Sequence, residues 1–117
     1  MKKYIIPLLL FLLVFSCKKE KFPDKDILIG TWIEQDGNNS KIIFTEQQMF
    51  LFLENFVDTN NYTLNKEDNV LILSSTNDPD IKTELRILYN KKSEELKIWD
   101  LFVGIPEEEN ISIYKKM

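Results

Sequence analysis

The most reactive side chain in the sequence belongs to Cys17, the only cysteine among 117 residues. A thiol can act as a nucleophile or carry a covalent modification, but Cys17 has no second cysteine with which to form an internal disulfide. The chain also contains no histidine, so the commonest general base and the commonest metal ligand are missing. Because an unpaired thiol is a liability in an oxidising compartment, these residues favour modification of Cys17.

Other candidates for catalysis or metal binding are weak. A lysine could activate a serine or threonine, but Tyr114-Lys115 lies on a predicted strand with nothing that marks it as part of a catalytic pair. Glu107 to Glu109 with Asp100 could act as paired carboxylates on glycosides, although a run of glutamates is typical of a solvated loop. Residues 77–80, Asn-Asp-Pro-Asp, could hold calcium weakly but lack the EF-hand spacing. We therefore expect a protein without catalysis, cofactor or metal.

The segment before Cys17 has the layout of an export signal. Lys2 and Lys3 form a positive start, and Ile5 to Phe15 is apolar apart from Pro7. A helix needs about 20 apolar residues to span a membrane, and this run is shorter. Residues 1–16 are therefore predicted to be a signal peptide.

Leu13-Val14-Phe15-Ser16-Cys17 resembles the lipobox of bacterial lipoproteins. The resemblance implies cleavage before Cys17 and acylation of its thiol, with chains such as palmitate holding the protein on the membrane. Lys18 follows instead of aspartate, which in this family implies the outer membrane, with the leaflet left open. The alternatives are a secretory signal with an incidental cysteine and a single-pass anchor.

The part that remains after cleavage suits one domain. Its length is 117 − 16 = 101 residues, and 15 − 2 = 13 basic residues face 19 acidic ones, so the formal charge is −6. An acidic balance without a basic stripe argues against nucleic acid as a partner and against electrostatic binding to anionic lipid. Residues 17–26, broken by Pro23, are predicted to be a lipidated tether, and residues 27–117 the domain.

After the tether, apolar and polar residues alternate, which predicts strands with one wet face. On residues 81–90, for example, Leu85, Ile87 and Tyr89 alternate with polar neighbours. The eight predicted strands are Ile27 to Gln35, Ser40 to Thr45, Gln47 to Leu53, Asn61 to Asn65, Asn69 to Ser75, Ile81 to Asn90, Leu96 to Phe102 and Asn110 to Lys115. Short turns between them, one of them at residues 58–60, imply antiparallel hairpins in series.

One segment is ambiguous, because Gln47 to Phe56 could also form a short helix. As a strand it would be apolar on both faces, with Met49 and Leu51 on one side and Phe50 and Phe52 on the other. One of these faces would need to be covered by a loop, a partner or a ligand.

Leu28-Ile29-Gly30-Thr31-Trp32 resembles the Gly-x-Trp signature of lipocalins and of the smaller lipocalin-like domains of bacterial lipoproteins. The resemblance implies an all-β, antiparallel, up-and-down eight-stranded barrel in which Trp32 closes one end. It also implies that Phe22 to Ile27 crosses the barrel floor. A basic side chain from the last strand would lie over the tryptophan. Lys115 or Lys116 is the positional match, and we assign Lys115 with Gly30 and Trp32 to this barrel-closing motif.

An eight-stranded barrel is filled by side chains or holds one small ligand. Residues that could contact a ligand or partner are Phe44, Phe50, Phe52, Leu85 and Trp99, with Trp99 outside or at a barrel mouth. The first hypothesis is a lipid-anchored envelope protein that binds a small apolar ligand or an envelope protein. The second is an interaction or immunity-type protein whose barrel is filled and whose loops dock on its partner.

Overall fold

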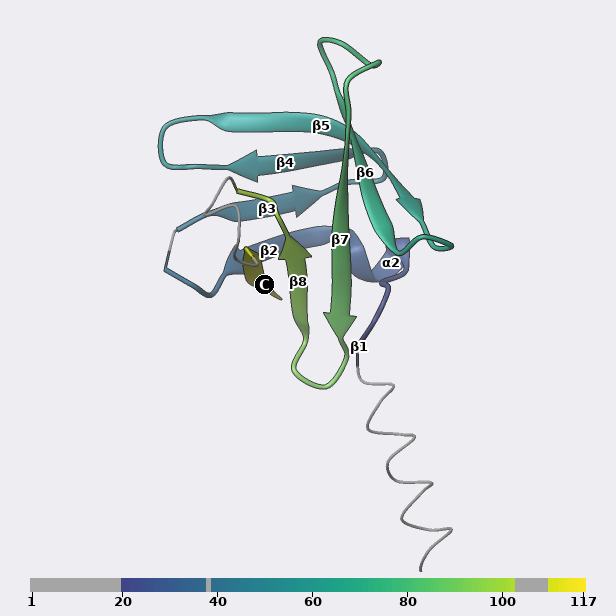
Figure 1. Ribbon diagram of the computed structural model, residues 1–117. Coiled ribbons are helices and arrows are strands. Elements are labelled where there is room, and N and C mark those ends of the chain that lie inside the picture. Colours follow the sequence, from purple (N-terminus) through teal and green to yellow (C-terminus); the bar gives the residue numbers. More distant parts are fainter. Residues whose placement is uncertain (1–19, 38, 103–109) are drawn as a thin grey trace, which may run out of the picture.

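Eight strands close into one antiparallel barrel in the computed structural model, which describes residues 20–37, 39–102 and 110–117 (Figure 1). The predicted signal peptide, Cys17 and Glu107 to Glu109 lie outside the described residues. The barrel strands are β2 (Gly30–Glu34), β3 (Lys41–Phe44), β4 (Gln48–Phe52), β5 (Val57–Asn65), β6 (Val70–Ser75), β7 (Lys82–Asn90), β8 (Glu95–Trp99) and β9 (Ile111–Lys116). They are preceded by β1 (Glu20–Lys21) and α2 (Lys25–Leu28).

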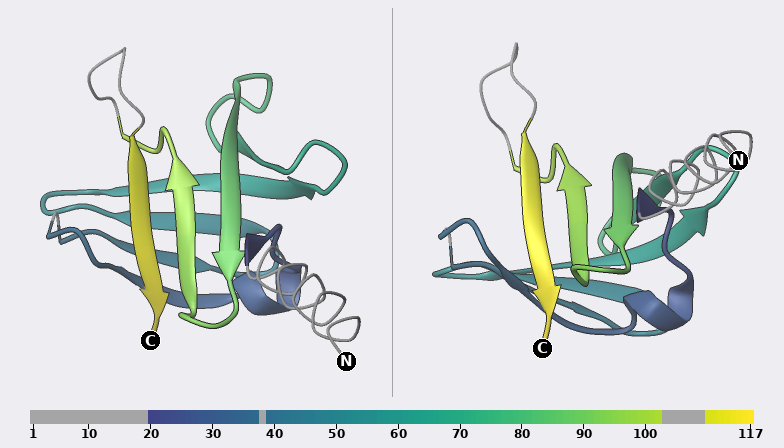
Figure 2. Two further views of the ribbon diagram at one scale, coloured as in Figure 1. Left: turned by 60° about the horizontal axis from the view of Figure 1, so that its bottom comes forward. Right: turned by 90° about the horizontal axis from the view of Figure 1, so that it is seen from below.

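Each barrel strand pairs with the next one along the chain. The ring is closed by β9, whose Tyr114 and Lys116 lie opposite Glu34 and Trp32 of β2. Figure 2 shows β7, β8 and β9 crossing steeply over β3, β4 and β5, which turns the sheet into two packed layers. The prediction of an all-β, up-and-down, eight-stranded barrel of lipocalin-like architecture is therefore confirmed.

The inward side chains fill the barrel with a single apolar core. It runs from Trp32 at one end to Leu51, Leu73 and Leu85 near the other. The closed end of the barrel is the end that carries Gly30 and the connections at residues 45–47, 66–69 and 91–94. The open end carries the connections at residues 35–40, 53–56, 76–81 and 100–110.

The boundary between β4 and β5 differs from the prediction. The predicted turn at residues 58–60 lies within β5, and the chain instead turns at residues 53–56. Asp58 and Asn60 lie on the inward side of β5. A turn was predicted there because aspartate and asparagine are common in turns. The helix considered for Gln47 to Phe56 does not form, because β4 pairs with both β3 and β5.

The folded part begins earlier than the predicted boundary at Ile27. Glu20 and Lys21 pair with Asn90 and Tyr89 of β7, and Phe22 packs against the core. Leu28, the last residue of α2, is fully buried beneath the barrel. Most of the predicted tether at residues 17–26 is therefore part of the domain. No helix within the described ranges is long and apolar enough to cross a membrane.

Candidate functional site

Trp32 forms the floor of the barrel at the closed end. Its side chain is fully buried, and its indole Nε1 donates a hydrogen bond to the carbonyl of Leu28 at 2.8 Å. The Tyr89 ring packs against the indole in an edge-to-face arrangement, with 6.0 Å between the ring centroids. Lys116 Nζ lies 5.5 Å from the ring centroid and donates to the carbonyl of Ile27 at 2.5 Å. The floor thus combines an aromatic plug with a cation that holds the segment running beneath it.

Gly30 is required by both its backbone conformation and its surroundings. Its φ of +139° is a conformation that side chains with a Cβ rarely adopt. A Cβ at this position would lie 2.7 Å from Cε of Lys116. Gly30 therefore leaves room for the Lys116 side chain to cross β2 and reach the ring of Trp32.

The assignment of Lys115 to the barrel-closing motif is wrong, and Lys116 takes that place. Alternation along β9 buries Ser112 and Tyr114, so the next residue with the same orientation is Lys116. Lys115 lies opposite Ile33 and Glu95, on the outer face. The resemblance predicted that a basic side chain of the last strand covers Trp32, and the strand register determines that this residue is Lys116.

Lys116→Ala is expected to lower the free energy of unfolding by about 1 kcal/mol or more. It removes a cation–π contact worth ~0.5–2 kcal/mol and a hydrogen bond worth ~1 kcal/mol. Lys115→Ala is the matched control, because loss of an exposed side chain usually changes stability by less than about 0.5 kcal/mol. Urea unfolding of residues 18–117 measures both, and equal effects would contradict this account of the floor.

A buried polar cluster lies between β2 and β9 on the open-end side of the barrel. Ser40 Oγ donates to Glu34 Oε1 and lies 2.6 Å from the Tyr114 hydroxyl. Burial raises the pKa of Tyr114, the hydrogen bond with Ser40 opposes this shift, and the nearby Glu34 and Asp36 add to it. These contacts satisfy polar groups that would otherwise be costly in the core. The cluster is not among the residues that line the mouth pocket described below.

The raised pKa of Tyr114 makes stability fall at alkaline pH. An unfolded tyrosine ionises near pH 10, whereas the folded side chain keeps its proton to higher pH. The unfolded state then binds fewer protons, so the free energy of unfolding decreases as pH rises from about 10 towards the folded pKa. Tyr114→Phe is expected to be less stable at neutral pH but to lose less stability on going to alkaline pH. Urea midpoints across the alkaline range test this, and unchanged pH dependence in the variant would contradict it.

The best candidate for a binding site is a pocket of about 190 Å³ at the open end. This mouth pocket has an apolar floor of four core side chains, which are Met49, Leu51, Leu73 and Leu85. Its rim is mostly polar and is formed by Asp58, Asn60, Thr83, Asp100 and Leu101. Asn60 Nδ2 donates to Asp58 Oδ2 at 3.3 Å, which orients part of this rim.

The pocket opens where two neighbouring strands separate. β8 pairs with β7 only along Ile87 to Asn90, so the first half of β7 lacks β8 beside it. Asp100, with a φ of +59°, turns the chain away directly after Trp99. Leu85 consequently faces the mouth at the point where the barrel wall is incomplete.

The five predicted contact residues do not form one site. Leu85 lines the mouth pocket, whereas Phe44 is buried in the core against the Tyr62 ring. Phe50 and Phe52 face outward from β4, half-buried, and Lys41 lies over the Phe52 ring at 4.6 Å. The sequence did not point to Asp58 and Asn60, because a turn was predicted there.

Trp99 lies on the outer face of β8, half-buried. The guanidinium of Arg86, on β7, stacks over its ring at 4.5 Å from the centroid. The indole Nε1 is buried and has no hydrogen-bond partner among the described residues. Trp99 is therefore neither in the mouth pocket nor a freely exposed anchor.

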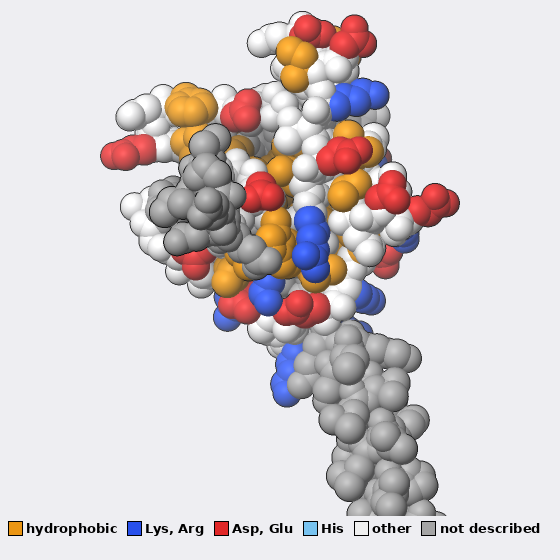
Figure 3. All heavy atoms as spheres, viewed as in Figure 1, with side chains coloured by type: hydrophobic (Ala, Val, Ile, Leu, Met, Phe, Trp, Pro, Cys, Tyr) orange, Lys and Arg blue, Asp and Glu red, His pale blue; other side chains and the backbone are white. Residues whose placement is uncertain are grey.

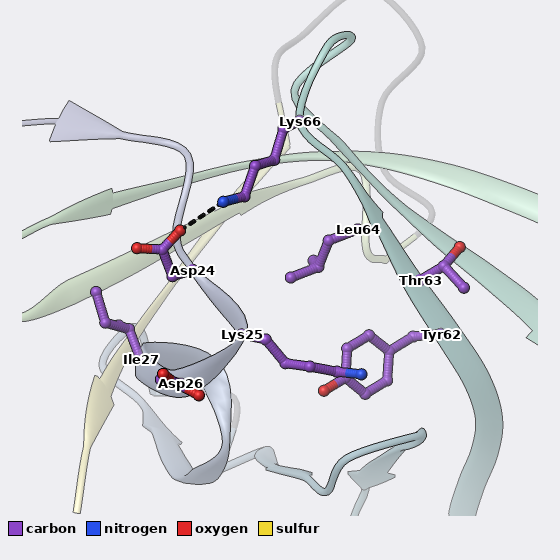
Figure 4. Close-up of a pocket in the computed structure, with 8 residues that line it drawn as sticks. All are labelled: Asp24, Lys25, Asp26, Ile27, Tyr62, Thr63, Leu64 and Lys66. Atoms are coloured by element: carbon purple, nitrogen blue, oxygen red, sulfur yellow. Dashed lines mark hydrogen bonds and ion pairs between the residues drawn. The ribbon is translucent and has the colours of Figure 1, made fainter.

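A larger groove of about 510 Å³ lies between α2 and the closed-end half of β5 (Figure 4). An ion pair between Lys66 Nζ and Asp24 Oδ1 at 2.8 Å crosses it, and Lys25 Nζ lies 5.6 Å from the Tyr62 ring centroid. These charged contacts fasten the N-terminal segment to the barrel wall. We favour the smaller mouth pocket as the binding site because four core side chains form its floor, whereas the groove is lined by one core side chain, Tyr62, and four charged residues.

The mouth pocket carries the carboxylates of Asp58 and Asp100 on its rim, and the groove carries those of Asp24 and Asp26. Within the described ranges, no three acidic or cysteine side chains lie close enough to hold a metal. The sequence contains the spacing Ser-x-x-Lys at Ser112 and Lys115, but Ser112 is buried inside the barrel and Lys115 lies outside. At residues 77–80, Asp78 Oδ1 accepts from the Asp80 N–H at 3.2 Å, as in an ordinary turn.

Comparisons with protein-family models, with curated proteins and with solved structures found no match. The class of protein therefore rests on the fold alone, an eight-stranded lipocalin-like barrel with a shallow pocket at one mouth.

Proposed function

We propose that this protein is a lipid-anchored binding protein of the cell envelope, held in the outer membrane by acyl chains on Cys17. Its open end binds a small apolar ligand, or an apolar side chain of a protein partner, without catalysis. The mouth pocket carries this proposal, because its core floor offers apolar contact and its polar rim offers hydrogen-bonding groups.

The volume of the pocket limits the size of the ligand. Pockets for drug-sized ligands measure roughly 300–1,000 Å³, and this one measures about 190 Å³. Deeper in the barrel, Trp32 and Phe44 are 0% and 1% exposed, so the core is occupied by side chains. A short apolar group fits the mouth, whereas a large lipid would need the core to open.

A second function is favoured by exposed apolar residues around the same end. Phe56 and Ile81, on two open-end loops, are 60% and 59% exposed. Exposed aromatic and aliphatic side chains on loops are typical anchors for a protein partner. On this alternative the filled barrel is a scaffold, and its loops dock on an envelope protein or a toxin.

Leu85→Phe is expected to fill the mouth pocket and weaken ligand binding about tenfold or more, since ~1.4 kcal/mol of binding free energy has that effect. Native mass spectrometry of the purified protein measures any co-purified small molecule. Titration with the neutral dye N-phenyl-1-naphthylamine measures access to the pocket.

Leu88→Phe is the matched control, because it makes the same change on the outward face of the same strand. It is expected to bind the dye as the unchanged protein does. Equal dye binding by both variants, with both folded by circular dichroism, would exclude the mouth pocket as the site and favour docking through the loops.

A further inference from the structure

The point at which the chain enters the barrel determines which end can lie near a membrane anchor. β1 pairs with the last two residues of β7, Asn90 and Tyr89, at the closed end. Lys97 Nζ contacts Glu20 Oε1 at 2.6 Å and fastens β1 to β8 as well. The chain is therefore attached to the barrel from Glu20 onward.

The chain between the anchor and this attachment is short. Glu20 comes three positions after Cys17, with Lys18 and Lys19 between them, and an extended chain spans at most ~3.6 Å per position, so the reach is about 10 Å. The nine residues of β7 run from the open end to the closed end and span about 30 Å at ~3.3 Å each. A cysteine embedded through its acyl chains thus holds the closed end at the membrane and leaves the open end distant.

The charge distribution favours the same orientation. Among the described residues, each open-end connection carries at least one carboxylate and none carries a lysine or arginine; the carboxylates are Asp36, Glu54, Asp78, Asp80 and Asp100. The three closed-end connections carry Lys66, Lys91 and Lys92, with Lys91 and Lys92 both exposed. They also carry four carboxylates, Glu46, Glu67, Asp68 and Glu94, so the closed end is less acidic than the open end rather than basic. Figure 3 shows acidic side chains on the loop at the top of this face and at its left edge. Most basic side chains lie lower down, where acidic ones lie among them, and one basic group lies just below the top loop. An anionic membrane surface attracts exposed lysines and repels carboxylates.

We propose that the closed end of the barrel lies against the membrane surface, with the connection at residues 91–94 nearest to the lipid headgroups and the mouth pocket facing away. This orientation rests on the proposed acylation of Cys17. It makes the membrane the partner of the closed end and leaves the open end for a ligand or protein that arrives from the aqueous side.

Labelled cysteines measure the orientation, because acylation occupies the only native thiol. The full chain carrying Lys92→Cys or Asn77→Cys is purified from membranes in acylated form and labelled with bimane. It is then added to vesicles of phosphatidylethanolamine and phosphatidylglycerol that contain a lipid with a headgroup nitroxide. Quenching of bimane at position 92, in the closed-end connection, is expected to be several-fold stronger than at position 77, in the open-end loop.

A longer tether is the control for the cause of this difference. Twenty Gly and Ser residues inserted between Lys19 and Glu20 extend the tether by about 25 Å. Quenching at position 92 is expected to drop towards that at position 77, while the protein stays on the vesicles. Unchanged quenching with the longer tether would show that the tether does not set the orientation.

The possible failures are distinguishable. Acylated protein that binds the vesicles but shows equal quenching at the two positions, or stronger quenching at 77, overturns the orientation and leaves the anchor intact. Protein that mass spectrometry shows to be unacylated overturns the anchor, and the orientation with it.

Discussion

Replacing Cys17 by serine is expected to remove the acyl anchor and with it stable membrane association. Each buried methylene contributes about 0.8 kcal/mol, one acyl chain gives only marginal binding, and two or three chains make it lasting. The unchanged protein is expected in the membrane fraction, with the mass of residues 17–117 plus acyl groups. The variant is expected either as an uncleaved precursor or, if cleaved, as a released protein.

Ser16→Ala is the control for this experiment, because it alters the neighbouring residue but keeps a small side chain before the cleavage point. It is expected to be cleaved, acylated and membrane-bound. Membrane fractionation combined with intact-mass spectrometry separates these outcomes. A cleaved Cys17→Ser protein that remained in the membrane fraction would disprove the lipoprotein assignment.

Replacing Trp32 by alanine is expected to lower the free energy of unfolding by about 3–5 kcal/mol. The substitution empties the floor of the barrel, and deletion of a fully buried tryptophan costs this much because the surroundings collapse only partly. It also removes the hydrogen bond to Leu28 and the contacts with Tyr89 and Lys116. Domains of this size have stabilities of ~5–15 kcal/mol, so a large part of the population is expected to unfold on mild heating.

Trp99→Ala is the matched control, because the same side chain is removed from the outer face. The loss is expected to be clearly smaller, about 1 kcal/mol for the stacking with Arg86 plus some packing. Urea unfolding of both variants, followed by circular dichroism, measures the difference. Similar losses at the two tryptophans would mean that Trp32 does not hold the floor in place.

The alternation of apolar residues was sufficient to predict most of the strands, whereas the closed barrel was predicted from the resemblance at Gly30 and Trp32. The alternation located β7 within one residue, because Leu85, Ile87 and Tyr89 face a core while their neighbours face water. It failed at β5, where Asp58 and Asn60 face inward at the mouth. Inward positions near an open end touch solvent, so they can be polar, and polar inward residues interrupt the pattern that identifies a strand.

The N-terminal segment shows a similar limit. Residues 20–26 are charged and contain a proline, which is typical of a linker, yet Phe22 packs on the core and Asp24 pairs with Lys66. The two partners in that ion pair are 42 positions apart in the sequence. Local composition carries no information about a contact at that separation.

The sequence by itself determined the strand order, the need for glycine and tryptophan at one barrel end, and the thiol available for an anchor. Side-chain alternation and residue type are local properties, so they can be read along the chain. Only the tertiary structure decided that Lys116 rather than Lys115 covers Trp32 and that Leu85 lines a mouth pocket with Asp58 and Asp100. It also decided that the chain enters at the closed end. Strand register and barrel closure bring these residues together, and both depend on pairings between distant segments.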